Sequence, residues 1–320
     1  MKNTPQKLAL LLFAVLFLIS AMPASALFGK KEAAVDPHAP VLQDQEITTY
    51  GGIPYCGTFT AEDDEEGAVT YAVVKEPKKG SVSVTGEEFV YTPEEKKTGH
   101  DSFTVTATDA DGNVSAPATV RIDILKRKTA VTYSDMTAHS SYFAAISLAE
   151  RGIYEGRSVA GQRYFEPESE VTRSEFLAMA MKAADITVFD NVEVTGFADD
   201  AAIPTWVKGC ASAAAREGIV SGIVTEEGLS FCGDEPISLK EAAAVLDRLL
   251  DVADVALEEE QGDWAAQAVA NMEAAQVIAA GSFGSENAVR GISRGEAAEM
   301  LSAAMMLLEK EEKPVFRWIG

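Results

Sequence analysis

A hydroxyl side chain followed three residues later by a glutamate occurs three times in the last two-thirds of this chain. The pairs are Thr172 with Glu175, Ser238 with Glu241, and Ser293 with Glu296. This spacing is typical of a capping box, in which the hydroxyl and the carboxylate satisfy free backbone N–H groups at a helix start, each cap being worth roughly 1 kcal/mol. We therefore interpret the three pairs as structural helix starts.

The residue after the hydroxyl is the one that suggests binding. It is Arg173 in the first copy and Arg294 in the third, where the positive end of the helix dipole opposes a cation. A planar guanidinium pairs directionally with a carboxylate, so these arginines are candidate ligand contacts. The alternative is an intramolecular salt bridge to one of the many acids. The second copy has Leu239 there, followed by Lys240, and leucine cannot pair with a carboxylate.

Two tryptophans stand near the expected starts of other helices. Trp206 follows Asp199 and Asp200, and Trp264 follows Asp263. A tryptophan at a helix start is more often a core anchor than a sugar platform, and the sequence favours the core. Nearby glycines are best interpreted as turn formers that need unusual backbone angles. They are Gly152, Gly156, Gly218, Gly222 and Gly281.

These features belong to a weak threefold repeat with a period of roughly 55–65 residues, which indicates one structural unit used three times around a shared core. The copies read Gly152-Ile153-Tyr154-Glu155-Gly156, Gly218-Ile219-Val220-Ser221-Gly222 and Val277-Ile278-Ala279-Ala280-Gly281, followed in the first by Tyr164-Phe165-Glu166-Pro167 and Val171-Thr172-Arg173-Ser174-Glu175. The pattern resembles the S-layer homology family. Helical spacing predicts six helices in three pairs, including 206–217, 239–251, 264–275 and 294–308.

The resemblance implies an all-α bundle with pseudo-threefold symmetry, built from repeats 130–187, 192–254 and 255–309. It also implies a partner, a pyruvylated secondary cell-wall polysaccharide of the peptidoglycan layer, bound in grooves between repeats. Arg173 and Arg294 would meet its carboxylates, and Trp206 and Trp264 would pack inward with an edge in the groove. Because Leu239 departs from the motif, at least one groove is expected to be inactive or altered.

The region 41–126 has a different, alternating pattern of apolar and polar residues, as in Ser102-Phe103-Thr104-Val105-Thr106-Ala107, with Gly, Pro and Asp clusters between the segments. This predicts an antiparallel immunoglobulin-like sandwich. Phe89-Val90-Tyr91-Thr92-Pro93 and Gly99-His100-Asp101-Ser102-Phe103 resemble cadherin-like, immunoglobulin-like modules of bacterial surface proteins. The acids at 63–66 and 109–111 lack the spacing of a calcium loop, so solvated turns are favoured over a metal site.

The N-terminus predicts export. Lys2 and Lys7 precede an apolar run, and Ala24-Ser25-Ala26 is a small-residue cleavage site, so 1–26 is interpreted as a signal peptide, with a retained anchor as the alternative. Residues 27–40 are expected to be a linker and 310–320 a tail. The formal charge of −23, from 27 basic and 50 acidic residues, disfavours nucleic acid and direct membrane binding.

Cysteine usage leaves two interpretations open, a disulfide between Cys210 and Cys232 or three unpaired buried thiols.

The sequence contains no nucleophile elbow, metalloprotease helix or phosphate loop, and we predict no enzyme, no cofactor and no metal. The expected function is a non-catalytic exported protein anchored to the cell wall, displaying the sandwich at the surface. The alternative is a secreted adhesin or carbohydrate-binding module, in which the sandwich binds and the repeats are a scaffold.

Overall fold

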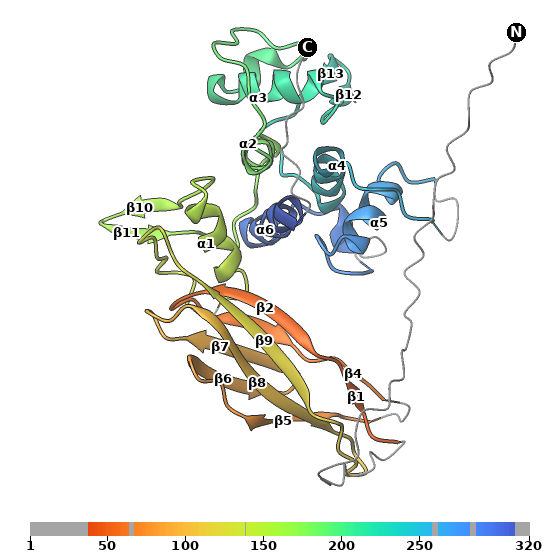
Figure 1. The fold of residues 1–320 in the computed structure, drawn as a ribbon. Helices are drawn as coiled ribbons and strands as arrows, with labels where there is room; N and C mark the ends of the chain where they lie inside the picture. Colours follow the sequence, from red (N-terminus) through yellow and green to blue (C-terminus); the bar gives the residue numbers. More distant parts are fainter. Residues whose placement is uncertain (1–37, 64–66, 138, 258–261, 282–285, 311–320) are drawn as a thin grey trace, which may run out of the picture. The chain divides into compact units, whose positions relative to one another are not determined.

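The structure is a computed structural model that describes residues 38–310, apart from 64–66, 138, 258–261 and 282–285. The predicted signal peptide at 1–26, nearly all of the predicted linker at 27–40 and the tail beyond residue 310 lie outside the described residues. Figure 1 labels the helices and strands. Within the described part of the chain, no helix is long and apolar enough to cross a membrane.

The N-terminal region is a two-sheet sandwich. One sheet has the order β2-β9-β8-β5 and the other β3-β7-β6, and two short strands, β1 and β4, pair separately. The bounds are β1 Val41–Leu42, β2 Gln45–Tyr50, β3 Tyr55–Thr58, β4 Ala61–Glu62, β5 Thr70–Lys75, β6 Gly80–Thr85, β7 Glu88–Pro93, β8 Gly99–Thr108 and β9 Ala118–Leu125.

The predicted immunoglobulin-like sandwich is therefore confirmed, with one correction. Strands β2 and β9 run parallel, with Ile47 opposite Ile122, whereas the other pairs are antiparallel. The expectation of an antiparallel sandwich was wrong for this pair because β2 lies beside β9, the last strand of the sandwich, instead of pairing with β3, its neighbour in sequence.

Aromatic residues fill the space between the two sheets. The ring of Phe89 stacks on Phe59 at 4.6 Å and meets Phe103 edge-on at 5.5 Å, centroid to centroid. Strand β9 buries Val120, Ile122 and alternate neighbours, as period-two spacing requires. Each fully buried side chain of this size contributes roughly 1.5–3 kcal/mol.

The C-terminal region contains six α-helices among its described residues, together with two hairpins and two short 3₁₀ turns. The helices are α1 Tyr142–Glu150, α2 Arg173–Ala183, α3 Thr205–Arg216, α4 Leu239–Leu250, α5 Ala266–Ala274 and α6 Arg294–Lys310; the 3₁₀ turns are η1 Asp200–Ala202 and η2 Glu286–Val289. We define the first repeat by α1 and α2, the second by α3 and α4, and the third by α5 and α6.

The expectation of an all-α region needs correction, because hairpins separate the two helices of the first and second repeats. They are formed by β10 Arg157–Val159 with β11 Gln162–Tyr164, and by β12 Ile223–Thr225 with β13 Gly228–Ser230. Gly161 and Gly228 have positive φ angles of 83° and 126°. In each hairpin the chain therefore turns back after a strand of three residues, a segment too short to form a stable helix.

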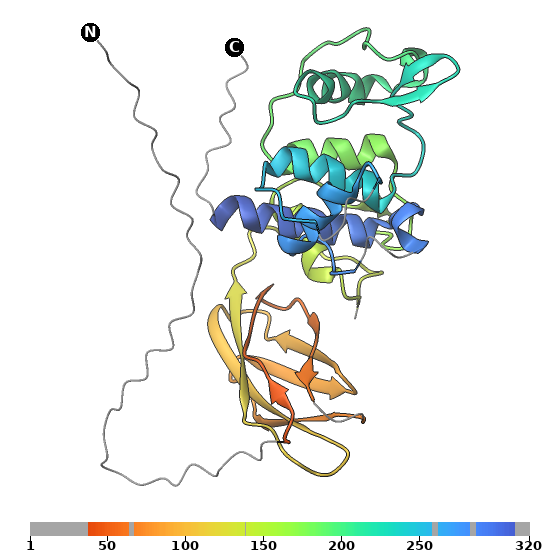
Figure 2. The same cartoon turned by 90° about the vertical axis from the view of Figure 1, so that its right-hand side faces the viewer.

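The three second helices are joined at the centre of the region. Helices α2, α4 and α6 contact one another, and Figure 1 shows them nearly end-on with α1, α3 and α5 outside them, whereas Figure 2 shows them from the side. Before each helix stands a buried apolar residue, Val171, Ile237 or Ile292. The N–H of Val171 donates to the carbonyl of Ile292 (3.1 Å), that of Ile292 to Ile237 (2.9 Å), and that of Ile237 to Val171 (2.9 Å).

These three hydrogen bonds form a closed ring, which we call the central ring. Each repeat gives one donor and one acceptor to it, so the arrangement is approximately threefold. Because a buried backbone group without a partner is costly, all three repeats are needed to satisfy the ring. The apolar core around it continues through all three repeats, which supports the expectation of one shared core.

Candidate functional site

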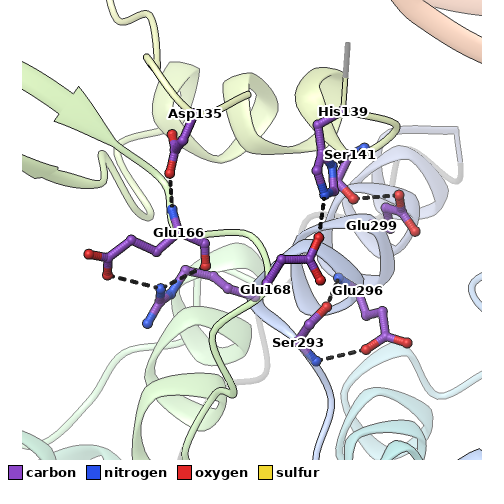
Figure 3. Close-up of polar contacts among 9 residues, drawn as sticks. Asp135, His139, Ser141, Glu166, Glu168, Ser293, Glu296 and Glu299 are labelled. Atoms are coloured by element: carbon purple, nitrogen blue, oxygen red, sulfur yellow. Dashed lines mark hydrogen bonds and ion pairs between the residues drawn. The ribbon is translucent and has the colours of Figure 1, made fainter. Parts of the chain in front are cut away.

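All three predicted capping boxes are present. The hydroxyl of Thr172 accepts from the N–H of Glu175, and that of Ser238 accepts from Glu241, with each glutamate carboxylate returning to the backbone N–H of the cap residue. At α6, the N–H of Ser293 donates to Glu296 at 2.7 Å, and the N–H of Glu296 donates to the Ser293 hydroxyl at 3.2 Å. Figure 3 shows this last cap beside a polar cluster of the first repeat. The capping side chains thus fix where α2, α4 and α6 begin.

The start of each arginine-bearing helix is also held by a loop of another repeat. The N–H groups of Arg173 and Ser174 donate to the carbonyls of Glu235 and Gly233 in the second repeat, both at 2.9 Å. Those of Arg294 and Gly295 donate to Ser169 (2.8 Å) and Pro167 (2.9 Å) in the first repeat. We call the first contact the 1–2 junction and the second the 3–1 junction.

A carboxylate orders the loop at each junction. Asp135 accepts from the N–H groups of Phe165 (3.0 Å) and Glu166 (2.7 Å), and Figure 3 shows it directed at the backbone of Glu166. Asp199 accepts from Phe231 and Cys232, both at 2.8 Å. The second residue of each pair is left-handed, with φ of 58° at Glu166 and 54° at Cys232. These bonds offset part of the strain of that conformation and fix the preceding carbonyl.

At the 3–1 junction the fixed carbonyls bind Arg294. Its Nη1 donates to the carbonyl oxygens of Phe165 (3.2 Å) and Glu166 (3.1 Å) and lies 3.5 Å from Oε2 of Glu166. The guanidinium also stands over the ring of Tyr154, 5.5 Å from its centroid. Arg294 is only 8% exposed, so the protein holds this cation in one place.

At the 1–2 junction Arg173 is held similarly but has a different acidic partner. Its Nε donates to the carbonyl of Phe231 at 3.0 Å, and its Nη1 lies 2.6 Å from Oε1 of Glu241. The guanidinium lies 5.9 Å from the centroid of the Phe231 ring. The two arginines therefore form the intramolecular salt bridges that the sequence left as the alternative. Any role in binding has to coexist with those pairs.

The third copy of this arrangement is altered. Leu239 begins α4 and packs, partly buried, against the core, and Lys240 binds Asp263 at 2.6 Å. Glu296, the capping glutamate of α6, binds Arg290 of its own repeat. Hydrogen bonding to Arg290 lowers the pKa of Glu296, against a smaller raising effect of burial. Ion pairs thus occupy the side chains of both Lys240 and Glu296.

The two tryptophans do not lie in the core. Trp206 is 62% exposed and Trp264 is 67% exposed. The expectation of a core anchor was wrong because small and medium-sized residues such as Ala211, Val207 and Met272 form the packing faces of α3 and α5, while Trp206 lies on the exposed side of α3 and Trp264 precedes the start of α5. An exposed indole leaves a flat apolar surface of the kind on which sugar rings stack.

The cysteines are free. Cys210 is buried on α3, Cys232 is half-buried in the loop of the 1–2 junction, and Cys56 lies on β3. The possible disulfide between Cys210 and Cys232 is therefore absent, and the alternative of three unpaired buried thiols holds for the pairing, but only Cys210 is buried. Burial raises the pKa of Cys210 to about 12, so this thiol is unreactive at neutral pH.

The predicted turn glycines have the expected backbone conformation. Each of the five named above has positive φ, between 65° and 80°. A Cβ on Gly156 would lie 2.5 Å from the carbonyl oxygen of Tyr164, whereas one on Gly152 would meet nothing within 4 Å. Glycine is therefore required sterically at 156 and conformationally at 152.

The polar cluster near the 3–1 junction does not form a hydrolytic triad. The hydroxyl of Ser141 donates to Glu299 at 2.6 Å, and Nδ1 of His139 accepts from the backbone N–H of Ser141 at 3.1 Å. Nε2 of His139 lies 3.1 Å from Oε1 of Glu168, and a dashed line marks this contact in Figure 3. The imidazole therefore does not activate this hydroxyl. Among the described residues, no group of three or more His, Cys, Asp or Glu side chains is arranged to hold a metal ion.

Comparisons with known proteins match parts of the chain. Residues 37–123 match the family model of a bacterial Ig domain. Two curated proteins are similar over 123 residues, which is 37% of this chain. They are an amylopullulanase of Thermoanaerobacterium thermosulfurigenes, 32% identical over 6% of its length, and exoglucanase XynX of Acetivibrio thermocellus, 31% identical over 11%.

The chain thus spans a small fraction of these relatives. Each match is longer than the region 37–123, so it includes residues outside that region. Among solved structures, the CbhA fibronectin(III)-like modules of Clostridium thermocellum align with 28% of this chain and 47% of theirs, at 22% identity and a TM-score of 0.21. The SrpA adhesin of Streptococcus sanguinis aligns with 31% of this chain and 68% of its own, at 20% identity and a TM-score of 0.22.

Sequence analysis missed the acids that organise the junctions. Asp135 was not singled out, and Asp199 was noted only as a neighbour of Trp206. Both contact loops 30 or more residues away, so spacing along the chain gives no sign of the contact. Their shared position, seven residues before Tyr142 and Trp206 respectively, was the available signal.

Proposed function

We propose that this chain is a non-catalytic exported protein that binds an acidic cell-wall polysaccharide through its helical repeats. The observation that carries the proposal is the placement of Arg173 and Arg294. Each guanidinium is fixed at a junction between two repeats by carbonyls of the neighbouring loop. A cation held in place before the ligand arrives loses little conformational freedom on binding.

The remaining donors of these side chains supply the binding chemistry. The contacts of Arg173 use Nε and Nη1, and those of Arg294 use Nη1. At Arg294 a sugar carboxylate can accept from Nε and Nη2 in the paired geometry that carboxylates favour, whereas at Arg173 it can accept from Nη2. The resemblance to the S-layer homology family makes a pyruvylated secondary cell-wall polysaccharide the proposed ligand. The exposed indoles of Trp206 and Trp264 provide stacking surfaces near the helix starts.

The overall charge of the chain restricts how such a ligand is recognised. At −23 the protein repels a polyanion at long range. Affinity for an acidic polymer then has to come from short, directional contacts at the few fixed arginines, rather than from a diffuse basic surface. Arg173 and Arg294 meet this requirement, because each guanidinium is largely buried at its junction. The third position has Leu239 and offers no such contact.

The sandwich is proposed to be the part displayed away from the wall. Its family match is to a bacterial Ig domain, and the similar curated proteins are carbohydrate-active enzymes. These matches favour an accessory role beside other wall or secreted proteins. The alternative is that the sandwich itself binds carbohydrate and the repeats only carry it.

The test is cosedimentation of the chain from residue 27 onward with purified walls, before and after chemical removal of the attached polymer. We expect the protein to pellet only with walls that retain the polymer, and the Arg173→Ala, Arg294→Ala double variant to remain in solution. Pelleting that is unchanged in the folded double variant would contradict the proposal. Pelleting that survives removal of the polymer would favour the alternative.

A further inference from the structure

Glu166 lies between two arginines at the 3–1 junction. Its Oε1 lies 2.9 Å from Nη2 of Arg157 on β10, and its Oε2 lies 3.5 Å from Nη1 of Arg294. The Glu166 side chain is 31% exposed and that of Arg157 is 69% exposed, whereas that of Arg294 is 10% exposed. One carboxylate thus bridges a buried and an exposed guanidinium, using one oxygen for each.

Arg294 does not depend on this carboxylate for its position. Its Nη1 also donates to the carbonyls of Phe165 and Glu166, and its guanidinium stands over the ring of Tyr154. The backbone of Glu166 is held separately, through its N–H, by Asp135. The Glu166 side chain is therefore able to rotate away while the loop and Arg294 stay in place.

The 1–2 junction lacks these properties. The residue equivalent to Glu166 is Cys232, which has no carboxylate. Arg173 binds Glu241, whose other oxygen, Oε2, accepts from the N–H and the hydroxyl of Ser238 at 2.9 Å each. Glu241 cannot leave Arg173 freely, because moving its side chain would also disturb the cap of α4.

We propose that the Glu166 carboxylate occupies the position of a ligand carboxylate, so that the 3–1 junction binds an acidic sugar by exchanging one carboxylate for the other. Arg157 and Arg294 are then the two cations that receive the ligand, and Glu166 is a built-in competitor that sets the affinity. Arg173 remains paired with Glu241. This inference rests on the proposed function and assigns its ligand contact to one junction, with Arg157 as an added binding residue.

The test uses Glu166→Gln with Glu168→Gln as the matched control. Both changes remove one carboxylate from the same loop, but Glu168 faces His139 instead of the arginines. The probe is a methyl hexoside carrying a 4,6-linked pyruvate ketal, titrated calorimetrically into the chain from residue 27 onward. Since a partly exposed ion pair is worth about 0.2–1 kcal/mol, loss of the competitor should tighten binding by roughly 1.5- to 5-fold. Glu168→Gln should leave the affinity unchanged, and Arg157→Ala should weaken it several-fold.

A measurement without ligand tests whether Glu166 shields Arg157, independently of whether the proposed sugar binds. Phenylglyoxal modifies accessible guanidinium groups, and peptide mass spectrometry follows Arg157 with Arg163 as an internal reference, since Arg163 pairs with Glu155 instead. Arg157 should react faster in Glu166→Gln than in the parent or in Glu168→Gln, while the reactivity of Arg163 should not change. Glu166→Asn, which suits a left-handed backbone, replaces Glu166→Gln if the latter melts early.

The binding and reactivity measurements together test the exchange of carboxylates and the identity of the ligand. Unchanged or weaker binding of the probe by folded Glu166→Gln, or unchanged Arg157 reactivity, would overturn the exchange model even if the walls still retain the protein. Faster Arg157 reactivity with no binding of the probe by any variant would overturn the proposed ligand and with it the exchange, leaving only an intramolecular ion pair.

Discussion

Nη1 of Arg173 lies 2.6 Å from Oε1 of Glu241, and this pair joins the first turn of α2 to the first turn of α4. The same glutamate caps α4 through its other oxygen. At the start of α6 the equivalent glutamate, Glu296, is paired with Arg290 of its own repeat. Among these caps, Glu241 binds an arginine of another repeat, whereas Arg294 at the 3–1 junction pairs with Glu166 of a loop and not with the capping Glu175.

The arginines and Leu239 should affect wall binding differently. Replacing Arg173 and Arg294 together by alanine should weaken retention by walls about ten- to a hundredfold, because a charge-assisted contact is worth roughly 1.5–3 kcal/mol. If exchange at the 3–1 junction is correct, Arg294→Ala alone should account for most of this loss. Leu239→Ala should leave retention nearly unchanged and lower the free energy of unfolding by about 1–2 kcal/mol, less than for a fully buried leucine. Equilibrium sedimentation with walls and urea unfolding measure the two effects.

Asp199→Asn should destabilise the 1–2 junction. The carboxylate accepts from two backbone N–H groups, and an amide has only one acceptor oxygen to offer them. One partly buried N–H loses its partner, at a cost of roughly 1–3 kcal/mol. The control is Asp234→Asn on the exposed side of the same loop, which should change the urea midpoint little. Equal midpoints for the two variants would show that Asp199 does not hold the loop.

Alanine substitutions at two glycines of the first repeat should separate backbone strain from steric conflict. Gly152→Ala should cost about 1–2 kcal/mol, the penalty for a left-handed alanine with open space around it. Gly156→Ala should cost roughly 1–3 kcal/mol more, because its Cβ would overlap the carbonyl of Tyr164 and the ring of Tyr133. Thermal unfolding of the two variants side by side tests the difference, and a Gly152 variant as unstable as the Gly156 variant would contradict the steric argument.

Asp200 should make the second repeat sensitive to acid. Hydrogen bonding to Lys208 and to the N–H and hydroxyl of Thr195 lowers the pKa of Asp200 from 3.8 to about 2. Because the pKa of the folded state is the lower one, the stabilisation is present above the ordinary pKa and is lost as the pH falls from about 4 toward 2. Lys208→Met should raise this pKa and move acid unfolding to higher pH. Carbon-detected NMR titration of Asp200 measures the pKa directly, and an unshifted value in the variant would rule out Lys208 as the cause.

The sequence predicted those features that depend on neighbours along the chain. The capping boxes follow from a hydroxyl and a glutamate three residues apart, and the helix starts at Arg173, Leu239 and Arg294 follow from the boxes. The alternating strands of the sandwich were predictable for the same reason. The parallel pairing of β2 with β9 was not, because it joins segments about 75 residues apart.

The sequence predicted which arginines lie at the junctions but not which acids they bind. The motif identified Arg173 and Arg294, but their acids come from different elements, Glu241 from a helix cap and Glu166 from a loop. Nothing in the spacing distinguishes Glu166 from the other acids of a chain that contains 50. The exposure of Trp206 and Trp264 does not follow from the size of their side chains, because the small residues of α3 and α5 supply the packing faces.

The central ring of Val171, Ile237 and Ile292 has a consequence for chain connectivity. A closed ring of hydrogen bonds has no first or last member, so the same three bonds can form wherever the chain is cut between repeats. A circularly permuted chain that starts within 251–257, with a flexible linker joining the end of α6 back to the sandwich, should therefore retain a cooperative melt. Deleting the third repeat outright should abolish that melt, since one donor and one acceptor of the ring would then face no partner.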